Sequence, residues 1–276
     1  MNELKLKTIQ SDKEGSPVTI LIHGGPGMDH SYFLPYLEEL KEVSEIVLYD
    51  LGHTHLAPYS INSLIEELAA VTKRFENRDL ILIGHSFGSA LILEYLKERA
   101  KSDIIGLVFI SWIYDGEWFK ERSLDVIETS KKLSERAFSK EISVQERTKL
   151  GYLAFLEHYF SPSFQTIGEK LLEDVRYNSQ LQSDFWETYL TSFDCKHVLK
   201  ALDLPLLSII GERDPIVKAS YTKKGHALTP NVVEVNCPEA FHFPFVEANE
   251  HVLTRIKSFI HNIHSSHKKG KKENFS

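Results

Sequence analysis

Short apolar runs alternate with helix-like segments along the first part of the chain, and this alternation constrains the fold more than any other feature. The runs are rich in aliphatic and β-branched residues, are bounded by polar or glycine-containing stretches, and lie at 18–22, 45–49, 79–84 and 104–111. Between them, apolar residues recur at helical spacing over 32–43, 63–77 and 87–99. Strands that are apolar on both faces and are joined by helices predict a mainly parallel sheet with helices on both sides.

The same rhythm returns near the C-terminus, whereas the middle of the chain lacks it. Strand-like runs lie at 204–210 and 231–235, and an amphipathic helix follows at 247–263. The intervening stretch is helix-like, charged and rich in aromatic residues, and it has no convincing strand pattern. The predicted organisation is a core of residues 1–112 and 201–263, a helical lid of residues 113–200, and a disordered basic tail of residues 264–276.

The composition places the chain among folded globular proteins, with 42% hydrophobic and 26% charged residues. The net charge of −7 and the confinement of the basic run to the tail argue against a nucleic acid partner. Cys195 and Cys237 lie far apart, so neither a disulfide framework nor a metal site is predicted. The N-terminal residues alternate charged and apolar side chains, unlike a signal peptide or a membrane span. We therefore expect a cytoplasmic protein without a membrane partner.

The strongest chemical signal is Gly84-His85-Ser86-Phe87-Gly88, a G-x-S-x-G pattern between an apolar strand and a helix that begins with small residues. A tight strand-to-helix turn exposes the serine hydroxyl and leaves no room for bulky side chains two positions before and after it. Gly84 and Gly88 meet this requirement. The pattern therefore predicts Ser86 as a nucleophile.

A serine hydroxyl needs a base that removes its proton and a carboxylate that orients the base. Of the 13 histidines, His242 lies in a loop between a late strand and the last helix, where parallel sheets place reactive groups. Asp214 directly follows another late strand and is the favoured carboxylate, with Glu212 and Asp115 as alternatives.

Acyl transfer also requires hydrogen-bond donors for a developing oxyanion. The segment His23-Gly24-Gly25-Pro26-Gly27 directly follows the first core strand and offers main chain with little side-chain cover. We expect the N–H groups of Gly25 and Phe87 to form the oxyanion hole.

These motifs, together with Gly211-Glu212-Arg213-Asp214 and His242-Phe243-Pro244-Phe245-Val246-Glu247, resemble the α/β-hydrolase superfamily over nearly the whole chain. The glycine-rich segment after the first core strand looks most like that of the proline iminopeptidase group. The resemblance implies the α/β-hydrolase fold, a Ser-Asp-His triad without a cofactor or metal, and a lid that shapes substrate choice. Members that are aminopeptidases bind the substrate's amino group with acidic residues, and Glu187 beside Trp186 is the candidate here.

Two classes of function follow from these features. The leading one is hydrolysis of a small ester, thioester, lactone or amide, as a carboxylesterase or as an aminopeptidase acting on short peptides. The alternative is a ligand-binding or receptor protein that keeps the fold and turns over slowly or not at all. A haloalkane dehalogenase or an epoxide hydrolase of this fold would need an aspartate where Ser86 stands. The sequence determines neither the oligomeric state nor the roles of His53 and His55.

Overall fold

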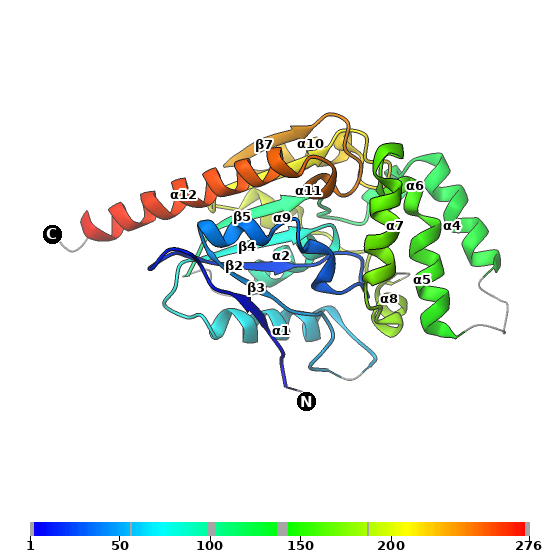
Figure 1. Ribbon diagram of the computed structural model, residues 1–276, viewed down its shortest axis with the longest axis horizontal. Helices are drawn as coiled ribbons and strands as arrows, with labels where there is room; N and C mark the ends of the chain where they lie inside the picture. The colour runs from blue at the N-terminus through cyan, green and yellow to red at the C-terminus, as the bar shows by residue number, and fades with distance from the viewer. Residues whose placement is uncertain (1–2, 56, 99–102, 137–142, 187, 274–276) are drawn as a thin grey trace.

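The computed structural model describes residues 3–55, 57–98, 103–136, 143–186 and 188–273. Its strands are β1 (Lys7–Ile9), β2 (Val18–Ile22), β3 (Glu45–Leu48), β4 (Leu80–His85), β5 (Ile104–Ile110), β6 (Leu206–Gly211) and β7 (Val232–Cys237). In this described part of the chain they form a seven-stranded sheet in the order β1-β3-β2-β4-β5-β6-β7 (Figure 1). Only β1 runs antiparallel to its neighbour, so the predicted mainly parallel sheet is present.

The burial of the strands explains why their sequences are apolar without alternation. Every residue of β2, β4, β5 and β6 is buried, because helices cover both faces of these central strands. The edge strand β7 instead mixes buried residues with partly and fully exposed ones. The sheet order changes direction at β2, which has β3 on one side and β4 on the other. Sheets of this kind bind ligands beyond the carboxyl ends of the strands at such a point.

The core helices and 3₁₀ turns are η1 (His30–Phe33), η2 (Glu38–Glu42), α1 (Ile61–Lys73), α2 (Phe87–Glu98), α10 (Ala219–His226), α11 (Pro244–Glu247) and α12 (Asn249–Glu273). Helix α2 packs on β4 with α1 beside it, whereas α12 packs on β5 and β6 with η2 beside it. The single helix predicted over 32–43 is wrong. That segment forms η1 and η2 instead, because Pro35 lacks the N–H that a continuous helix needs there.

Residues 113–200, here named the helical insertion, connect β5 to β6. Its elements are α3 (Trp118–Glu121), α4 (Leu124–Arg136), α5 (Val144–Ala154), α6 (Leu156–Tyr159), η3 (Pro162–Phe164), α7 (Gln165–Asp174), α8 (Ser179–Trp186) and α9 (Lys196–Lys200). Figure 1 shows α4 to α8 gathered at the end of the sheet toward which the parallel strands point. An isolated bridge between Asp115 and Asp194 brings the two ends of the insertion together.

Helix α12 continues to Glu273, so the prediction of a disordered tail from residue 264 is wrong for residues 264–273. His264 Nδ1 and His267 Nδ1 lie 2.9 Å and 3.1 Å from the carboxylate oxygens of Asp79. These contacts, together with a hydrogen bond from Lys268 Nζ to the Gly15 carbonyl, tie the helix to the core. The partners are remote in sequence, which is why composition alone missed them. Residues 274–276 of the predicted tail lie outside the described residues.

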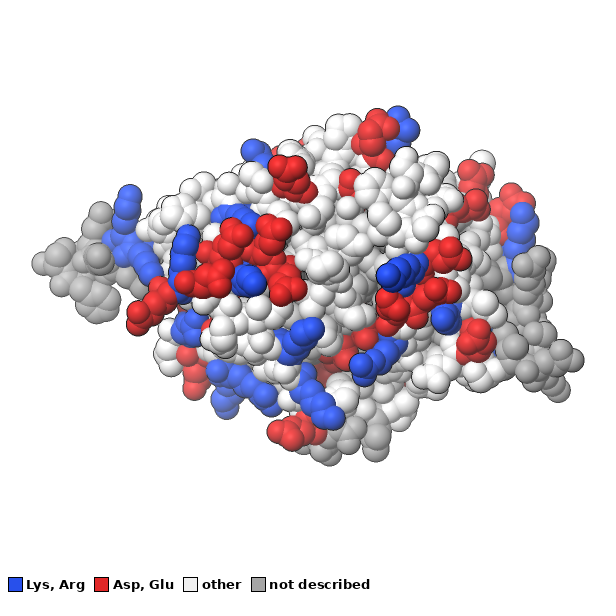
Figure 2. Space-filling model, in the orientation of Figure 1, with Lys and Arg blue, Asp and Glu red and all other residues white. Residues whose placement is uncertain are grey.

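Charged side chains of both signs are interspersed on the face drawn in Figure 2. Lys257 of α12 forms ion pairs with Glu39 at 2.9 Å and Glu42 at 3.1 Å. Among the helices that the structure describes, none has both the length and the apolar character that crossing a bilayer requires.

Candidate active site

Ser86 occupies a sharp turn between β4 and α2, with φ at +51°. This left-handed conformation is strained for a residue with a side chain, and the surrounding packing must hold it. A Cβ at Gly84 would lie 2.6 Å from Ser89 N, and a Cβ at Gly88 would lie 2.2 Å from the Ile22 carbonyl oxygen. Larger residues at either glycine would therefore force the turn apart. The turn has the geometry that the G-x-S-x-G pattern predicts.

His242 lies in the loop between β7 and α11, and its imidazole is held by Asp214 in the loop after β6. His242 Nδ1 is 2.7 Å from Asp214 Oδ2, and both side chains are buried. The other carboxylate oxygen, Oδ1, accepts the N–H groups of Ile216 at 2.8 Å and Val217 at 2.9 Å. The carboxylate is thus fixed on both sides and accepts the Nδ1 proton of His242. This tautomer leaves the imidazole Nε2 as the proton acceptor.

The alternative carboxylates named from the sequence have other partners. Glu212 lies 3.0 Å from Lys223 Nζ. Asp115 forms an ion pair with Lys196. No hydrogen bond or ion pair within the described residues joins either carboxylate to His242. Of the carboxylates considered, Asp214 is the one that the fold brings to this histidine.

The glycine-rich loop after β2 passes directly beside Ser86. Strands β2 and β4 are parallel neighbours in a register that pairs Ile22 with Gly84, so the loops that follow them emerge together. A Cβ placed at Gly24 would lie 2.8 Å from the Ser86 Cβ. The absence of side chains in this loop is therefore what allows main-chain groups to approach the serine.

Main-chain donors near Ser86 are of two kinds. The N–H of Ser86 itself donates to the Ile110 carbonyl at 2.9 Å and is therefore occupied. Within the described part of the chain, no hydrogen bond engages the N–H of Gly25 or of Phe87. These are the groups that the sequence predicts as oxyanion donors, and Phe87 also begins α2, where the helix dipole favours negative charge.

Ser86, His242, Gly25 and Phe87 line one small cavity of about 40 Å³. The rest of its wall is aromatic or aliphatic except for His85, and consists of Pro26, Met28, His85, Ile113, Trp118, Tyr152, Tyr159, Trp186, Leu190, Ile216 and Phe243. This volume is large enough for a few water molecules or a short side group. The fold therefore brings the predicted nucleophile, base and oxyanion donors to one largely apolar cavity.

The helical insertion supplies a large part of this wall. Trp186, singled out from the sequence, does line the cavity, whereas Glu187 lies outside the described residues. Sequence reasoning missed Trp118, Tyr152 and Tyr159, because the aromatic enrichment of the insertion does not say which rings face inward. The indole N–H of Trp118 is buried and has no hydrogen-bond partner in the described part of the chain.

Hydrogen bonds tie the insertion to both loops of the site. Tyr152 Oη donates to the Pro26 carbonyl at 3.1 Å, and the N–H of Asn178 donates to the Gly27 carbonyl at 2.7 Å. On the other side, the N–H of His242 donates to the Tyr159 carbonyl at 3.1 Å. The insertion thus contacts the main chain of the glycine-rich loop and of the loop that carries the histidine.

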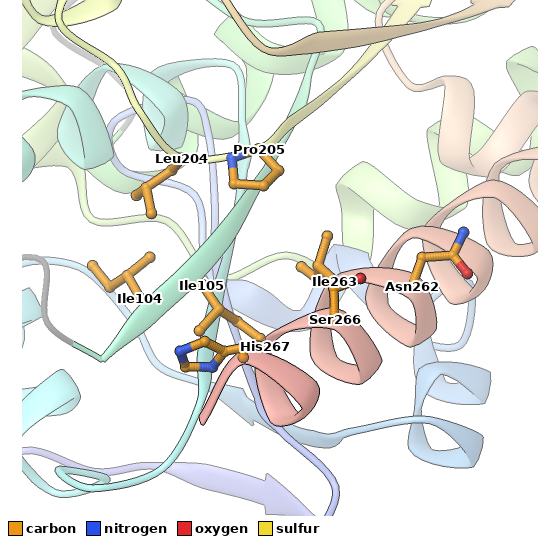
Figure 3. A pocket seen from close by; sticks show the side chains of 9 residues that line it. Ile104, Ile105, Leu204, Pro205, Asn262, Ile263, Ser266 and His267 are labelled. Carbon is orange, nitrogen blue, oxygen red and sulfur yellow. The ribbon is translucent and has the colours of Figure 1, made fainter. Parts of the chain in front are cut away.

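A larger groove lies at the opposite end of the sheet, where strands β5 and β6 begin. Its volume is about 610 Å³, and Ile104, Leu204 and Ile263 contribute to its apolar wall. Figure 3 shows these side chains with His267 and Ser266 of α12 along one side. Among the lining residues, none pairs a nucleophile with an oriented base. The chemistry of the lining, rather than the volume, identifies the smaller cavity as the candidate active site.

Comparison with known proteins agrees with this fold. Residues 19–254 match the sequence model of the alpha/beta hydrolase family. The chain belongs to this family. A proline iminopeptidase of Heyndrickxia coagulans is 26% identical to this hydrolase over 277 residues, which cover 90% of this chain and 92% of that protein. A second, from Lactobacillus helveticus, is 29% identical over 124 residues, covering 41% of this chain and only 42% of the relative.

Solved structures confirm the predicted α/β-hydrolase fold. An esterase of Thermogutta terrifontis superposes with a TM-score of 0.75 at 18% identity, covering 95% of this chain and 94% of that one. A proline iminopeptidase of Mycobacterium smegmatis superposes with a TM-score of 0.69 at 18% identity, covering 95% of each chain. At these identities the likeness concerns the fold. Family membership and these relatives together support hydrolase activity.

Proposed function

We propose that this protein is a serine hydrolase that cleaves a small ester or amide through an acyl intermediate on Ser86. The observation that carries the proposal is the convergence of Ser86, the Asp214-bound imidazole of His242, and two unengaged main-chain N–H groups on one cavity. Each element alone occurs in many proteins. Their convergence provides a nucleophile, an oriented base and an anion-binding site together.

The proposed reaction uses only side chains and main chain of this protein. His242 Nε2 accepts the Ser86 proton as the hydroxyl oxygen attacks the substrate carbonyl, and the N–H groups of Gly25 and Phe87 stabilise the oxyanion. Asp214 stabilises the imidazolium, which then protonates the leaving group. The bond between the carbonyl carbon and the leaving group breaks as this proton is delivered. Water, deprotonated by His242, then attacks the acyl carbon, and the proton passes to the Ser86 oxygen as the ester bond to it breaks and the acid leaves. Each oxyanion donor contributes about 3 kcal/mol of transition-state stabilisation in enzymes of this kind.

The size and the lining of the cavity favour a substrate with a short, uncharged acyl group. Its volume is small, and among the described residues that line it there is no carboxylate, ammonium or guanidinium side chain. Its walls are aromatic and aliphatic, which favours an apolar group. Trp186 contributes to this wall and is proposed to contact the acyl group. These features favour an esterase acting on short acyl chains.

Aminopeptidase activity on short peptides is the second candidate. It is favoured by the likeness to the proline iminopeptidase of Heyndrickxia coagulans, which covers 90% of this chain. An aminopeptidase needs an acidic group for the substrate's amino group, and Glu187 is the proposed residue. In either case the helical insertion is proposed to act as a lid over the site, since several of its aromatic residues line the cavity.

Labelling with a fluorophosphonate probe tests the mechanism. We expect the wild-type protein to be labelled and the Ser86→Ala variant not to be labelled. Ser208→Ala, which removes the hydroxyl of a fully buried serine, is the matched control and should label normally. Equal labelling of wild type and Ser86→Ala would show that Ser86 is not the activated nucleophile. No labelling of a folded wild type would favour the binding-protein alternative.

A substrate panel then separates the two candidate activities. We expect turnover of p-nitrophenyl acetate and little turnover of the p-nitroanilides of proline and alanine. Preferred cleavage of the anilides, lost on Glu187→Gln, would identify an aminopeptidase instead.

A further inference from the structure

A continuous hydrogen-bonded chain joins the three loops that meet at Ser86. The N–H of Gly24, in the glycine-rich loop, donates to Tyr32 Oη. Tyr32 Oη lies 2.9 Å from Nδ1 of His85, the residue directly before the serine. His85 Nε2 lies 3.0 Å from the main-chain carbonyl oxygen of His242. Two side chains thus connect the oxyanion loop, the serine turn and the loop that carries the base.

For a neutral His85, the end groups determine which atom donates each hydrogen bond of this chain. A carbonyl oxygen only accepts, so His85 Nε2 must carry the hydrogen that it shares with His242. In a neutral imidazole Nδ1 is then an acceptor, and Tyr32 must donate its hydroxyl hydrogen to it. The Tyr32 oxygen remains free to accept the N–H of Gly24. A protonated His85 would instead donate its Nδ1–H to the Tyr32 oxygen, so Tyr32 donates to Nδ1 only when His85 is neutral.

The surroundings favour that neutral state. Tyr32 and His85 are each 1% exposed, and the rings of Phe243 and Phe245 pack edge-on or tilted against them. Burial lowers the pKa of His85 well below its usual value, and the neighbouring imidazole of His242 lowers that pKa further. Burial likewise raises the pKa of Tyr32 well above its usual value. Both residues are therefore held as neutral hydrogen-bonding groups.

We propose that Tyr32 and His85 are positioning residues that fix the peptide leading to the Gly25 donor and the main chain of His242 relative to Ser86. This inference rests on the proposed function and adds the residues that keep its parts aligned. Neither side chain needs to touch the reacting atoms through these bonds. Displacement of a reacting group by about 1 Å lowers rates by about a hundredfold in enzymes, so small shifts of these loops matter.

Tyr32→Phe is the main test, because it keeps the ring and removes only the hydroxyl. We expect kcat for p-nitrophenyl acetate, and the rate constant for fluorophosphonate labelling, to fall about tenfold to a hundredfold, with KM changed less than about threefold. Loss of alignment reduces the stabilisation of the transition state more than it reduces the affinity for the substrate. The effect should therefore appear mainly in kcat.

Tyr221→Phe is the matched control. Tyr221 is also 1% exposed, and its hydroxyl accepts the main-chain N–H groups of Tyr114 and Asp115, none of these three residues being part of the cavity lining. Removing this hydroxyl costs a comparable set of buried hydrogen bonds, so it reports the purely structural effect of the change. We expect lowered thermal stability with kcat close to that of the wild type.

His85 provides an independent second test. Gln can supply one donor and one acceptor in place of the imidazole, whereas Ala supplies neither. We expect His85→Ala to lower kcat about tenfold or more and His85→Gln to restore a large part of it. The rescue distinguishes hydrogen bonding from simple space-filling and keeps the inference testable if one variant fails to fold.

The outcomes separate the inference from the function on which it rests. If the wild type labels at Ser86 while Tyr32→Phe keeps the kcat of Tyr221→Phe, the positioning role is overturned and the proposed function stands. Equal kcat for His85→Ala and His85→Gln would overturn it in the same way. If the folded wild type neither labels nor hydrolyses any substrate of the panel, the proposed function fails and the positioning role with it.

Discussion

The core contains a second serine, histidine and carboxylate joined by hydrogen bonds. Ser208 Oγ lies 2.7 Å from His226 Nε2, and His226 Nδ1 lies 2.7 Å from Glu234 Oε2. The carboxylate-to-imidazole distance matches the 2.7 Å between Asp214 and His242. Judged by hydrogen bonds alone, the second network is the more complete triad, because in the described part of the chain His242 is joined to Asp214 but no hydrogen bond joins it to Ser86.

The surroundings of the two serines differ. Ser208 is fully buried within strand β6, and its oxygen accepts the indole N–H of Trp112 at 2.7 Å. It appears in the lining of neither cavity described above. Ser86 stands on a strained turn, faces a cavity and lies beside unengaged main-chain donors. The difference between the two networks is therefore the space beside the serine: Ser86 lines a cavity in which a substrate and an oxyanion could lie, and Ser208 lines neither cavity.

The largest expected effect separates the two serines. We expect Ser86→Ala to lower kcat for p-nitrophenyl acetate by about a thousandfold to a millionfold, because the acyl intermediate cannot form. Ser208→Ala should keep kcat within about twofold, since its hydroxyl reaches no substrate. Steady-state kinetics of both variants, with folding checked by circular dichroism, measure this difference. A large loss of kcat in a folded Ser208→Ala protein would contradict the comparison.

The next largest expected difference in kcat is between variants of the two carboxylates, Asp214 and Glu234. Asp214→Asn keeps the shape of the side chain but no longer favours the tautomer in which Nε2 of His242 is the base, so we expect a loss of about 10⁴-fold in kcat. Glu234→Gln makes the equivalent change in the second network and should leave kcat nearly unchanged. The pair is measured with the same ester. Similar losses in both variants would show that the second network also serves the reaction.

The cavity itself distinguishes the two networks, and enlarging it should change specificity. Trp186→Ala removes a large side chain from the wall. We expect the ratio of kcat/KM for p-nitrophenyl hexanoate over the acetate to rise about tenfold or more, because each methylene accommodated in an apolar pocket contributes 1–3 kcal/mol, roughly tenfold or more. Ser208→Ala is the control and should leave the ratio unchanged. An unaltered ratio in Trp186→Ala would place the acyl group elsewhere.

The free energy of unfolding should show the opposite order from kcat: Ser208→Ala should lose more of it than Ser86→Ala. Ser208→Ala leaves the indole N–H of Trp112 buried without its acceptor, so we expect the free energy of unfolding to fall by about 1–3 kcal/mol. Ser86→Ala removes no main-chain bond and should change stability by less than about 0.5 kcal/mol. Urea denaturation of both variants measures the difference. A larger loss for Ser86→Ala would contradict it.

The smallest expected effect is on the pH dependence of stability. Burial lowers the pKa of His85 and of His226, and for His226 the charge of Glu234 opposes the shift. As pH falls below about 6.5, the unfolded chain therefore takes up a proton at each position before the folded protein does. The unfolded state then binds more protons, so stability falls as pH drops below 6.5, by at most about 1.4 kcal/mol per pH unit for each histidine.

The variants of these histidines measure that contribution. Urea unfolding between pH 7 and pH 5 should show a shallower decline of stability in His85→Gln than in the wild type. His226→Gln should flatten the decline less, because Glu234 offsets part of the burial effect. An unchanged slope in His85→Gln would mean that His85 is not the neutral buried group described here.

The sequence alone predicted the features that depend on neighbours along the chain. Apolar runs gave the positions of the parallel strands, because a strand covered on both faces must be apolar throughout. The strained turn at Ser86 was predictable because Gly84 and Gly88 stand two positions away on either side. The order of motifs favoured Asp214 and His242, since loops after parallel strands meet at one edge of the sheet. Their catalytic roles stay predictions until the variants are measured.

Only the tertiary structure decided which side chains share a space. The sequence treated Glu212 and Asp115 as alternatives to Asp214, and the hydrogen bond to His242 distinguishes them. It also gave no sign of the bond from His85 to the His242 carbonyl, or of the Asp79 contacts that order α12. Such contacts join residues far apart in the chain, so their energies depend on packing in three dimensions and leave no local pattern. Periodicity and turn chemistry, by contrast, act between near neighbours and are written directly in the sequence.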